Sequence, residues 1–136
     1  MHVAPPSPTV LSETVRRALA EDIDRGDVTT EACVPSSLMA EAELRAREPM
    51  VVCGLPILEE VYAQVDSRVD LDAHVLDGAQ VAADALVATV AGPAASILLG
   101  ERVALNFLQR LSGVATLTRR YVDALPVSST TRITDT

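Results

Sequence analysis

Residues 100–116 read GERVALNFLQRLSGVAT, and they lie at the centre of the longest helical pattern in this sequence of 136 residues. From Ala94 to Leu111, apolar side chains recur three and four positions apart, which predicts an amphipathic helix. Ser112-Gly113 predicts either a bend or a close packing contact within it. The helical pattern resumes at Val114 and ends at Leu125, just before Pro126, so we expect helix across most of this region.

The first thirty residues predict one helix and one acidic loop. Apolar residues at helical spacing from Leu11 to Ala20 indicate the helix, with Ser12 as its N-cap. The loop, residues 21–30, reads EDIDRGDVTT, and its aspartates are suited to accept hydrogen bonds from backbone N–H groups. An unstructured leader is predicted at the N-terminus by three prolines: Pro5, Pro6 and Pro8.

The central part of the sequence predicts strands on both sides of a second helix. Residues 39–47 alternate small or apolar side chains with charged ones, a period typical of a strand with one solvated face. Residues 50–53 form a short apolar strand, and Pro56 then begins an amphipathic helix. Residues 67–93 read as successive β segments, in which Asp77-Gly78 is predicted to be a hairpin turn.

The last residues predict a further strand. Residues 131–134 look like a strand that enters a core, and the sequence stops directly after it. The loops that follow strands carry the functional residues of α/β domains, so a complete domain of this kind is not expected to end there. We therefore expect that the sequence is truncated.

Composition argues against several classes of function. The net charge of −8 is unsuited to a nucleic-acid-binding protein, which needs a surplus of basic residues to neutralise phosphates. No apolar run approaches the roughly 20 residues that span a bilayer, and the N-terminus lacks the pattern of a signal peptide. We therefore expect a soluble, cytoplasmic protein that binds neither nucleic acid nor a membrane. Cys33 and Cys53 are expected to be buried free thiols rather than a disulfide.

Metal binding is also not expected. Asp22, Asp24 and Asp27 lie close together in the sequence, but the segment lacks the acidic residue at the last position of a calcium-binding loop. His2 and His74 are far apart and have no neighbouring cysteine pair, so a zinc site is not predicted either.

Arg102 is the candidate binding residue. Val103, Ala104 and Phe107 beside it are apolar, and an unpaired guanidinium is costly to bury, so we expect it to have a partner. One alternative is an ion pair with Glu101 or with a neighbouring helix. The other is a bidentate contact with the carboxylate or phosphate of a ligand, which the planar guanidinium suits. The spacing of the residues leaves both alternatives open.

Three segments, in order along the chain, resemble the quinolinate phosphoribosyltransferase family. Residues 21–30 are similar to its early acidic motif, and residues 100–116 are similar to its most characteristic helix. Residues 133–136, Ile-Thr-Asp-Thr, are similar to the opening of a family segment that continues with Arg and Lys. The resemblance covers nearly the whole chain from Leu11 onward.

The resemblance implies an enzyme that joins quinolinate to phosphoribosyl diphosphate with magnesium and releases diphosphate and carbon dioxide. The product is nicotinate mononucleotide, which is used for NAD synthesis. The implied fold is α+β, with a hammerhead, barrel-sandwich-like N-terminal domain and its helical leader over residues 1–112. Residues 113–136 would then be the first helix and strand of a truncated α/β barrel domain.

The resemblance also implies the residues at the site. Members of the family pair head to tail as homodimers, and the residue that matches Arg102 reaches into the partner's barrel to bind a quinolinate carboxylate. Thr136 matches a position at the edge of the substrate pocket. The other basic ligands and the acidic residues that bind diphosphate match positions beyond Thr136. We therefore expect no catalytic residue and no magnesium ligand in this chain, and no activity from it alone.

Three alternatives to this function are weighed. Residues 69–93 resemble the β module of biotinyl and lipoyl carriers, but carriers attach their cofactor to a lysine, and all 11 basic residues here are arginines. The paralogous protein associated with molybdenum transport shares the layout of the family and remains open. A chain that only dimerises, without catalysis, is the third alternative.

Overall fold

The computed structural model describes residues 6–23 and 28–134. The helices and strands in these ranges follow the order α1 (Pro8–Ile23), α2 (Val28–Cys33), β1 (Met39–Arg45), β2 (Met50–Val51), α3 (Leu55–Val65), β3 (Asp70–Ala73), β4 (Gln80–Val81), β5 (Leu86–Pro93) and α4 (Ala94–Asp123). The prediction of a mixed helix-and-sheet fold of the α+β class is confirmed. None of the described helices is both long enough and apolar enough to cross a bilayer.

The strands form two open antiparallel sheets. β5 is the central strand of a three-stranded sheet in the order β1-β5-β3. β1 runs along β5 from Met39, opposite Pro93, to Leu44, opposite Ala88. β2 and β4 form a separate two-stranded sheet. Because side chains alternate between the faces of a strand, β1 turns Leu44 toward the interior while Glu43 and Arg45 form an ion pair on the outside.

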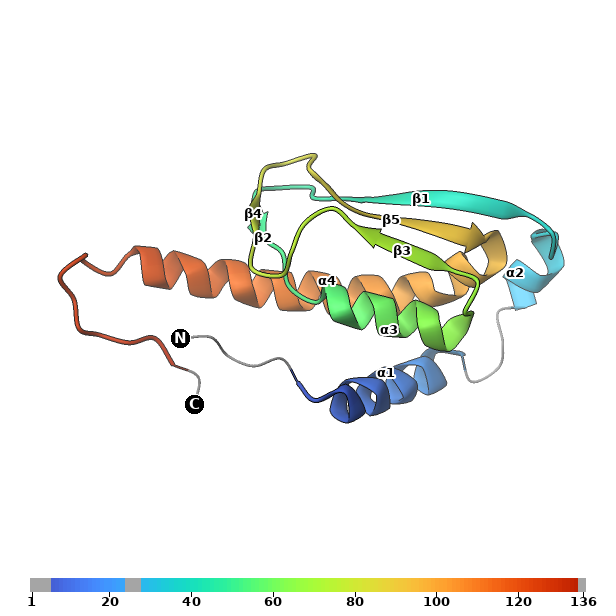
Figure 1. The fold of residues 1–136 in the computed structure, drawn as a ribbon, viewed down its shortest axis with the longest axis horizontal. Coiled ribbons are helices and arrows are strands. Elements are labelled where there is room, and N and C mark those ends of the chain that lie inside the picture. The colour runs from blue at the N-terminus through green and yellow to red at the C-terminus, as the bar shows by residue number, and fades with distance from the viewer. Residues whose placement is uncertain (1–5, 24–27, 135–136) are drawn as a thin grey trace.

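Helices cover one side of the three-stranded sheet (Figure 1). α4 runs beneath the sheet, α3 lies against α4, and α1 packs against both of these helices. The last turns of α4 project beyond the sheets and the other helices (Figure 1). The core between these layers is built from side chains that are less than 9% exposed: Val15, Leu58, Val61, Val87, Val90, Val103 and Leu108.

α1 begins three residues earlier than predicted. The Ser7 Oγ accepts a hydrogen bond from the Val10 N–H at 3.4 Å, and Pro8 suits the first turn, where its missing N–H has no helical partner to lose. The predictions of Ser12 as N-cap and of Pro8 in an unstructured leader were therefore wrong. Ser12 lies inside the helix, and its hydroxyl and carbonyl oxygens each accept a hydrogen bond from Gln64 Nε2 at 3.0 Å.

The strands that flank Asp77-Gly78 do not pair with each other, so the predicted hairpin was wrong. β3 pairs with β5, and β4 pairs with β2. The turn instead contacts the start of α3: the Asp77 carboxylate accepts hydrogen bonds from the N–H groups of Gly54 and Leu55 at 2.9 to 3.0 Å. The Gly78 N–H also donates to the Val52 carbonyl at 2.7 Å. Asp77 thus caps a helix that precedes it in the sequence.

α4 continues through Ser112-Gly113 without a break for 30 residues. Of the two outcomes predicted there, the close packing contact is confirmed, because Ser112 is buried and bonded to the backbone of Cys53. Residues 131–134 were predicted as a strand, but they pair with none of the described strands, and Ile133 is exposed. Without a neighbouring strand, the backbone groups of this segment have no ladder to join. The proposed domain boundary between residues 112 and 113 stays a prediction.

The predictions for residues 21–33 are met only in part. Residues 21–23 belong to α1 and residues 28–30 belong to α2, so these ends of the predicted acidic loop are helical. Residues 24–27 lie outside the described ranges. Cys33 and Cys53 are both free thiols, as predicted, but Cys33 is exposed and Cys53 is half-buried. Burial and the Asp77 carboxylate raise the pKa of Cys53, which keeps this thiol protonated and unreactive at neutral pH.

Candidate functional site

α4 presents Arg102 on its outward face. Val103 and Ala104 are buried in the core, but each step along an α-helix turns the side chain by about 100°, so Arg102 points away from them. Its side chain is 77% exposed. The guanidinium is therefore not buried by its apolar neighbours in the sequence, and it needs no partner to offset a desolvation cost.

Arg102 has an ionic partner across the space between α4 and α1. Its Nη1 lies 3.6 Å from the Asp22 Oδ1, whereas charge-assisted hydrogen bonds are about 2.7 to 2.9 Å long. Such an exposed ion pair contributes about 0 to 1 kcal/mol to stability. The cross-helix ion pair is present, but it is too weak to prevent Arg102 from binding the carboxylate of a ligand.

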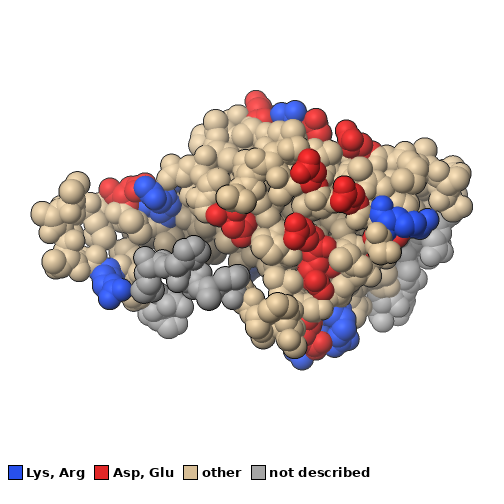
Figure 2. Space-filling view, in the orientation of Figure 1, with Lys and Arg blue, Asp and Glu red and all other residues tan. Residues whose placement is uncertain are grey.

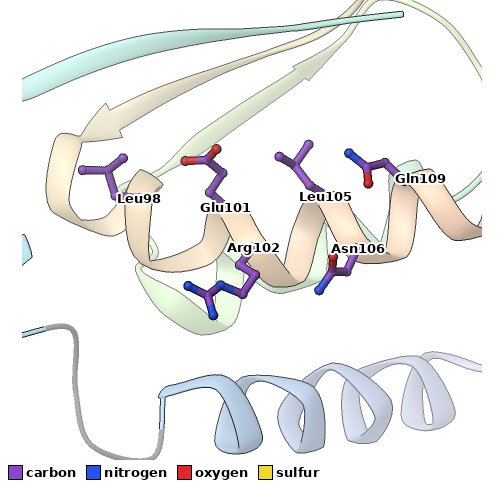
Figure 3. A pocket seen from close by; sticks show the side chains of 6 residues that line it. All are labelled: Leu98, Glu101, Arg102, Leu105, Asn106 and Gln109. Atoms are coloured by element: carbon purple, nitrogen blue, oxygen red, sulfur yellow. The ribbon is translucent and has the colours of Figure 1, made fainter. Parts of the chain in front are cut away.

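Glu101 is not the partner of Arg102. The two side chains leave α4 on opposite sides in Figure 3, with Arg102 and Asn106 directed toward α1 and with Glu101, Leu105 and Gln109 directed away from it. The six residues Leu98, Glu101, Arg102, Leu105, Asn106 and Gln109 line a shallow hollow of about 390 Å³. The hollow is open to solvent, so these residues alone do not enclose a ligand.

Tyr62 lies beneath this part of α4. Its ring is 4% exposed, and burial, with a smaller effect from the Glu101 carboxylate, raises the pKa of Tyr62 to about 12. The phenol therefore stays protonated at neutral pH and is not suited to act as a base. Its function in this structure is to pack against α4.

Three hydroxyl groups fix α4 to its surroundings. Near the first turn, the Ser96 Oγ donates a hydrogen bond to the Asp66 Oδ2 at 2.6 Å. Further along, Ser112 Oγ and Thr116 Oγ1 accept hydrogen bonds from the N–H groups of Cys53 and Val51 at 3.0 and 2.9 Å. None of these three hydrogen bonds was predicted from the sequence. The signal was the spacing of Ser112 and Thr116, which are four residues apart and so share one face of the helix.

The other predicted site residue and the metal predictions are only partly covered by the structure. Thr136 lies outside the described residues, as do Asp24 and Asp27. Asp22 is described, and it contacts Arg102 rather than other acidic residues. Within residues 6–23 and 28–134, no group of three or more His, Cys, Asp or Glu residues is placed to hold a metal ion.

The charge of the surface is uneven. Figure 2 shows acidic side chains across the middle of one face, where Figure 1 places β3 and α3, with arginines toward the edges. An anion is repelled by the acidic part of this face. An anionic ligand therefore needs a specific cationic contact, and Arg102 is an exposed arginine on the long helix α4.

Solved structures define the class of protein that has this fold. A nicotinate-nucleotide pyrophosphorylase from Francisella tularensis matches 89% of the chain with a TM-score of 0.82 and 35% identity. NadC from Streptococcus pyogenes matches 90% of the chain with a TM-score of 0.86, also at 35% identity. The match covers 42% of the Francisella chain and 44% of the Streptococcus chain.

Sequence comparisons give the family. A model described as "Quinolinate phosphoribosyl transferase, N-terminal domain" matches residues 27–112, which is more than half of the chain. The chain therefore belongs to the quinolinate phosphoribosyltransferase family. It is 41% identical over 125 residues to quinolinate phosphoribosyltransferase [decarboxylating] 1b from Nicotiana tabacum. It is 38% identical over 127 residues to a probable nicotinate-nucleotide pyrophosphorylase [carboxylating] from Synechocystis. These alignments cover 90% and 93% of the chain but only 36% and 42% of the two relatives.

Proposed function

We propose that this chain is the N-terminal part of an enzyme that transfers a phosphoribosyl group from phosphoribosyl diphosphate to quinolinate. The transfer is coupled to decarboxylation, so the products are nicotinate mononucleotide, carbon dioxide and diphosphate. The observation that carries this proposal is the family match over residues 27–112. Relatives from plants and a cyanobacterium are named for this activity, which favours it over the paralogous protein associated with molybdenum transport.

Arg102 is proposed to bind one carboxylate of quinolinate. Quinolinate is a dianion, and a guanidinium on a rigid helix is a pre-organised partner for a carboxylate. The exposed side chain, its weak pair with Asp22 and its place in an open hollow all support this role. Because the hollow has only one wall, we propose that the barrel domain of the partner in a homodimer supplies the other. Thr136 is proposed to lie at the edge of the same pocket.

The domain organisation, the metal ion and the location are proposed for the full-length enzyme. We propose that residues 1–112 form the hammerhead, barrel-sandwich-like domain and that residues 113–136 lead into an α/β barrel. Magnesium is proposed to accompany phosphoribosyl diphosphate. The described residues offer no cluster of ligands that fits this ion. A cytoplasmic location stays a prediction, since some relatives are named as mitochondrial or chloroplastic.

The first experiment compares residues 1–136 with the full-length enzyme. Both are assayed with quinolinate, phosphoribosyl diphosphate and magnesium, and nicotinate mononucleotide is measured. We expect product from the full-length enzyme and none above a protein-free blank from residues 1–136. Product from residues 1–136 alone would show that the reaction does not need the barrel. Absence of product from the full-length enzyme would contradict the proposed activity.

The second experiment tests Arg102 in the full-length enzyme. A charge-assisted hydrogen bond contributes about 1.5 to 3 kcal/mol, so Arg102→Ala should lower kcat/KM for quinolinate roughly ten- to a hundred-fold. Arg102→Lys should not restore it fully, because an ammonium group cannot form the bidentate contact. The melting temperature should change little, because the pair with Asp22 is weak.

Two variants serve as controls for this experiment. Asp22→Asn removes the ionic partner but keeps Arg102, so it reports on the structural alternative alone. Arg119→Ala removes another exposed arginine of α4, whose ion pair with Asp123 lies on the surface. We expect both to keep the kcat/KM for quinolinate within about two-fold, since pairs of this kind contribute little. If Asp22→Asn and Arg102→Ala lower stability equally and both leave quinolinate kinetics unchanged, Arg102 is not part of the site.

A further inference from the structure

Gly100 is in closer contact with a neighbouring helix than an alanine at its position would permit. A Cβ atom added to Gly100 would lie 2.8 Å from Tyr62 Cε1 and 3.1 Å from Tyr62 Cδ1. Ordinary contact begins near 3.4 Å, so the added methyl group needs about 0.6 Å more room at the nearer ring atom. The absence of a side chain at Gly100 therefore sets how closely α4 approaches α3.

The Tyr62 ring cannot easily move to give this room. It is 4% exposed and belongs to α3, and the side chain of Val61 lies on the same side, 3.5 Å from the added Cβ. A rigid ring in a close-packed core transmits a displacement to its neighbours instead of absorbing it. A methyl group at position 100 would therefore push α4 away from α3.

A second contact joins the same two helices one turn earlier. Ser96 Oγ donates a hydrogen bond to Asp66 Oδ2 at 2.6 Å, and Asp66 is the C-cap residue of α3. Ser96 and Gly100 are four residues apart, so both lie on the α3-facing side of α4. The contacts of Ser96 and Gly100 with α3 together fix the position of α4 next to Arg102.

Arg102 depends on this position of the backbone. Its own contact with Asp22 is long and exposed, and it does not hold the guanidinium in place. The point from which the Arg102 side chain starts, and so the region that its guanidinium can reach, is therefore set by where α4 places the Cα atom, two residues after Gly100. Binding sites need their groups within about 0.5 Å of the productive geometry, and a misplacement of about 1 Å costs up to about a hundred-fold in rate.

We propose that Gly100 and Tyr62 are positioning residues, which set the distance between α3 and α4 so that Arg102 reaches the quinolinate carboxylate. The inference rests on the proposed function of Arg102, and it adds two buried residues that touch no substrate. Tyr62 acts by its volume, and Gly100 acts by its lack of a side chain.

The test compares four forms of the full-length enzyme: the wild type, Gly100→Ala, Tyr62→Val, and the double variant Gly100→Ala with Tyr62→Val. A valine side chain ends before the two ring atoms that the added methyl group meets. We expect Gly100→Ala to raise the KM for quinolinate about ten-fold, with the KM for phosphoribosyl diphosphate within about two-fold of wild type. The double variant should recover most of the quinolinate KM, although the shortened side chain lowers its melting temperature.

A purely structural role gives a different result. It would lower the melting temperature of Gly100→Ala without a selective effect on quinolinate, and the double variant would then be the less stable of the two without any kinetic recovery. Either an unchanged quinolinate KM in Gly100→Ala or a failure of the double variant to recover it would overturn the proposal. Gly113→Ala is the matched control, because an added Cβ there meets no atom within 4 Å.

Two further measurements separate the possible failures. Should Gly100→Ala not fold, Ser96→Ala removes the second contact without adding volume, and it should raise the quinolinate KM two- to three-fold, on the order expected for a small displacement. An unchanged KM in that variant would also overturn the proposal. Arg102→Ala is measured alongside: no effect there means that the proposed function of Arg102 is wrong. An effect in Arg102→Ala but none in Gly100→Ala means that only the positioning role is wrong.

Discussion

The two halves of α4 belong to one helix but have different surroundings. From Ala94 to Ser112, residues at helical spacing are buried against α3, α1 and the sheet. From Gly113 to Asp123, no residue is buried, and four large apolar side chains are more than 40% exposed: Val114, Leu117, Tyr121 and Val122. The buried face ends at the residue where the family match ends.

The two halves of α4 differ in what stabilises their helical structure. Tertiary packing stabilises the first half, since most of the stability of a protein helix comes from burial of its apolar face. The second half has one tertiary hydrogen bond, from the Val51 N–H to Thr116 Oγ1, but no buried apolar face. It is helical mainly as a continuation of an already formed helix, for which each further residue adds a hydrogen bond without a new nucleus. Substitutions should therefore change stability strongly in the first half and weakly in the second.

The largest expected effect is a pair of leucine truncations. Leu108→Ala, at a side chain 6% exposed, should lower the free energy of unfolding by about 2 to 5 kcal/mol. Leu117→Ala, at a side chain 52% exposed, should stay within about 0.5 kcal/mol of wild type. Urea denaturation followed by circular dichroism measures both. Equal losses in the two variants would mean that the second half of α4 is packed in solution.

The hydroxyl of Ser112 should give the next largest effect. Ser112→Ala leaves the Cys53 N–H without its acceptor in a partly buried place, and an unsatisfied group of this kind costs about 1 to 3 kcal/mol. Thr118→Ala removes a hydroxyl from the exposed half of the same helix and should be nearly neutral. Denaturation of the two variants gives the comparison. A neutral Ser112→Ala would show that water replaces the hydroxyl.

Gly113→Ala should stabilise the protein by about 0.5 to 1 kcal/mol, because alanine restricts the unfolded chain and favours the helix. The position lies inside α4, and an added Cβ meets nothing within 4 Å. The same substitution at Gly100 should be destabilising, because the methyl group meets the Tyr62 ring. Melting temperatures of the two variants provide the measurement. A gain at both positions would contradict the close α3–α4 contact.

The smallest expected effect is on how the free energy of unfolding depends on pH in acid. Hydrogen bonds from the Arg68 side chain, the Ser96 hydroxyl and the Arg68 N–H hold the pKa of Asp66 well below its usual value of 3.8. A carboxyl group with a depressed pKa in the folded state stabilises the fold above its unfolded pKa, and this contribution is lost as the pH falls below that value. Asp66→Asn should therefore make the free energy of unfolding less dependent on pH below about 4.

Asp123→Asn is the control for the acid experiment, because Asp123 pairs with Arg119 in the exposed half of α4. Denaturation midpoints between pH 2 and pH 6 compare the two variants with wild type. A slope in Asp66→Asn that equals the wild-type slope would show that Asp66 contributes nothing to the acid response. The carboxyl of Glu13, whose pKa is lowered to about 2 by Arg16 and Arg17, should contribute to the remaining slope. Glu43 and Glu60, whose pKa values are also lowered, should contribute to it as well.

The sequence predicts the long helices and the first strand because their patterns are local. Periodic apolar residues in α3 and α4, and the alternation in β1, report directly on which face is buried. The Asp77-Gly78 hairpin was wrong because the partner of the turn is far away in the sequence. A turn motif gives no information on whether its carboxylate is used within the turn or by a distant helix.

The candidate site was predictable in part, because Arg102 also lies within a local pattern. Arg102 could be selected from the sequence as an arginine on an apolar helix, and one of its two alternatives, a pair with a neighbouring helix, is present in a weak form. The exposure of the Arg102 side chain follows from helical geometry, and it could be predicted from the spacing of Arg102 relative to the apolar residues of the helix. The contact between Gly100 and Tyr62 could not be predicted from the sequence, because it depends on how closely two helices approach. No local pattern encodes that distance.

The cap that Asp77 provides to α3 has a consequence for how the protein folds. The N-terminal N–H groups of α3 receive their acceptor only when a turn some twenty residues later has docked. A helix of 11 residues is too short to be stable alone in water, and here it also lacks a local side-chain cap. A synthetic peptide of α3 should therefore be largely unstructured. During folding, the first turn of α3 is expected to become protected from hydrogen exchange together with the β3–β4 turn.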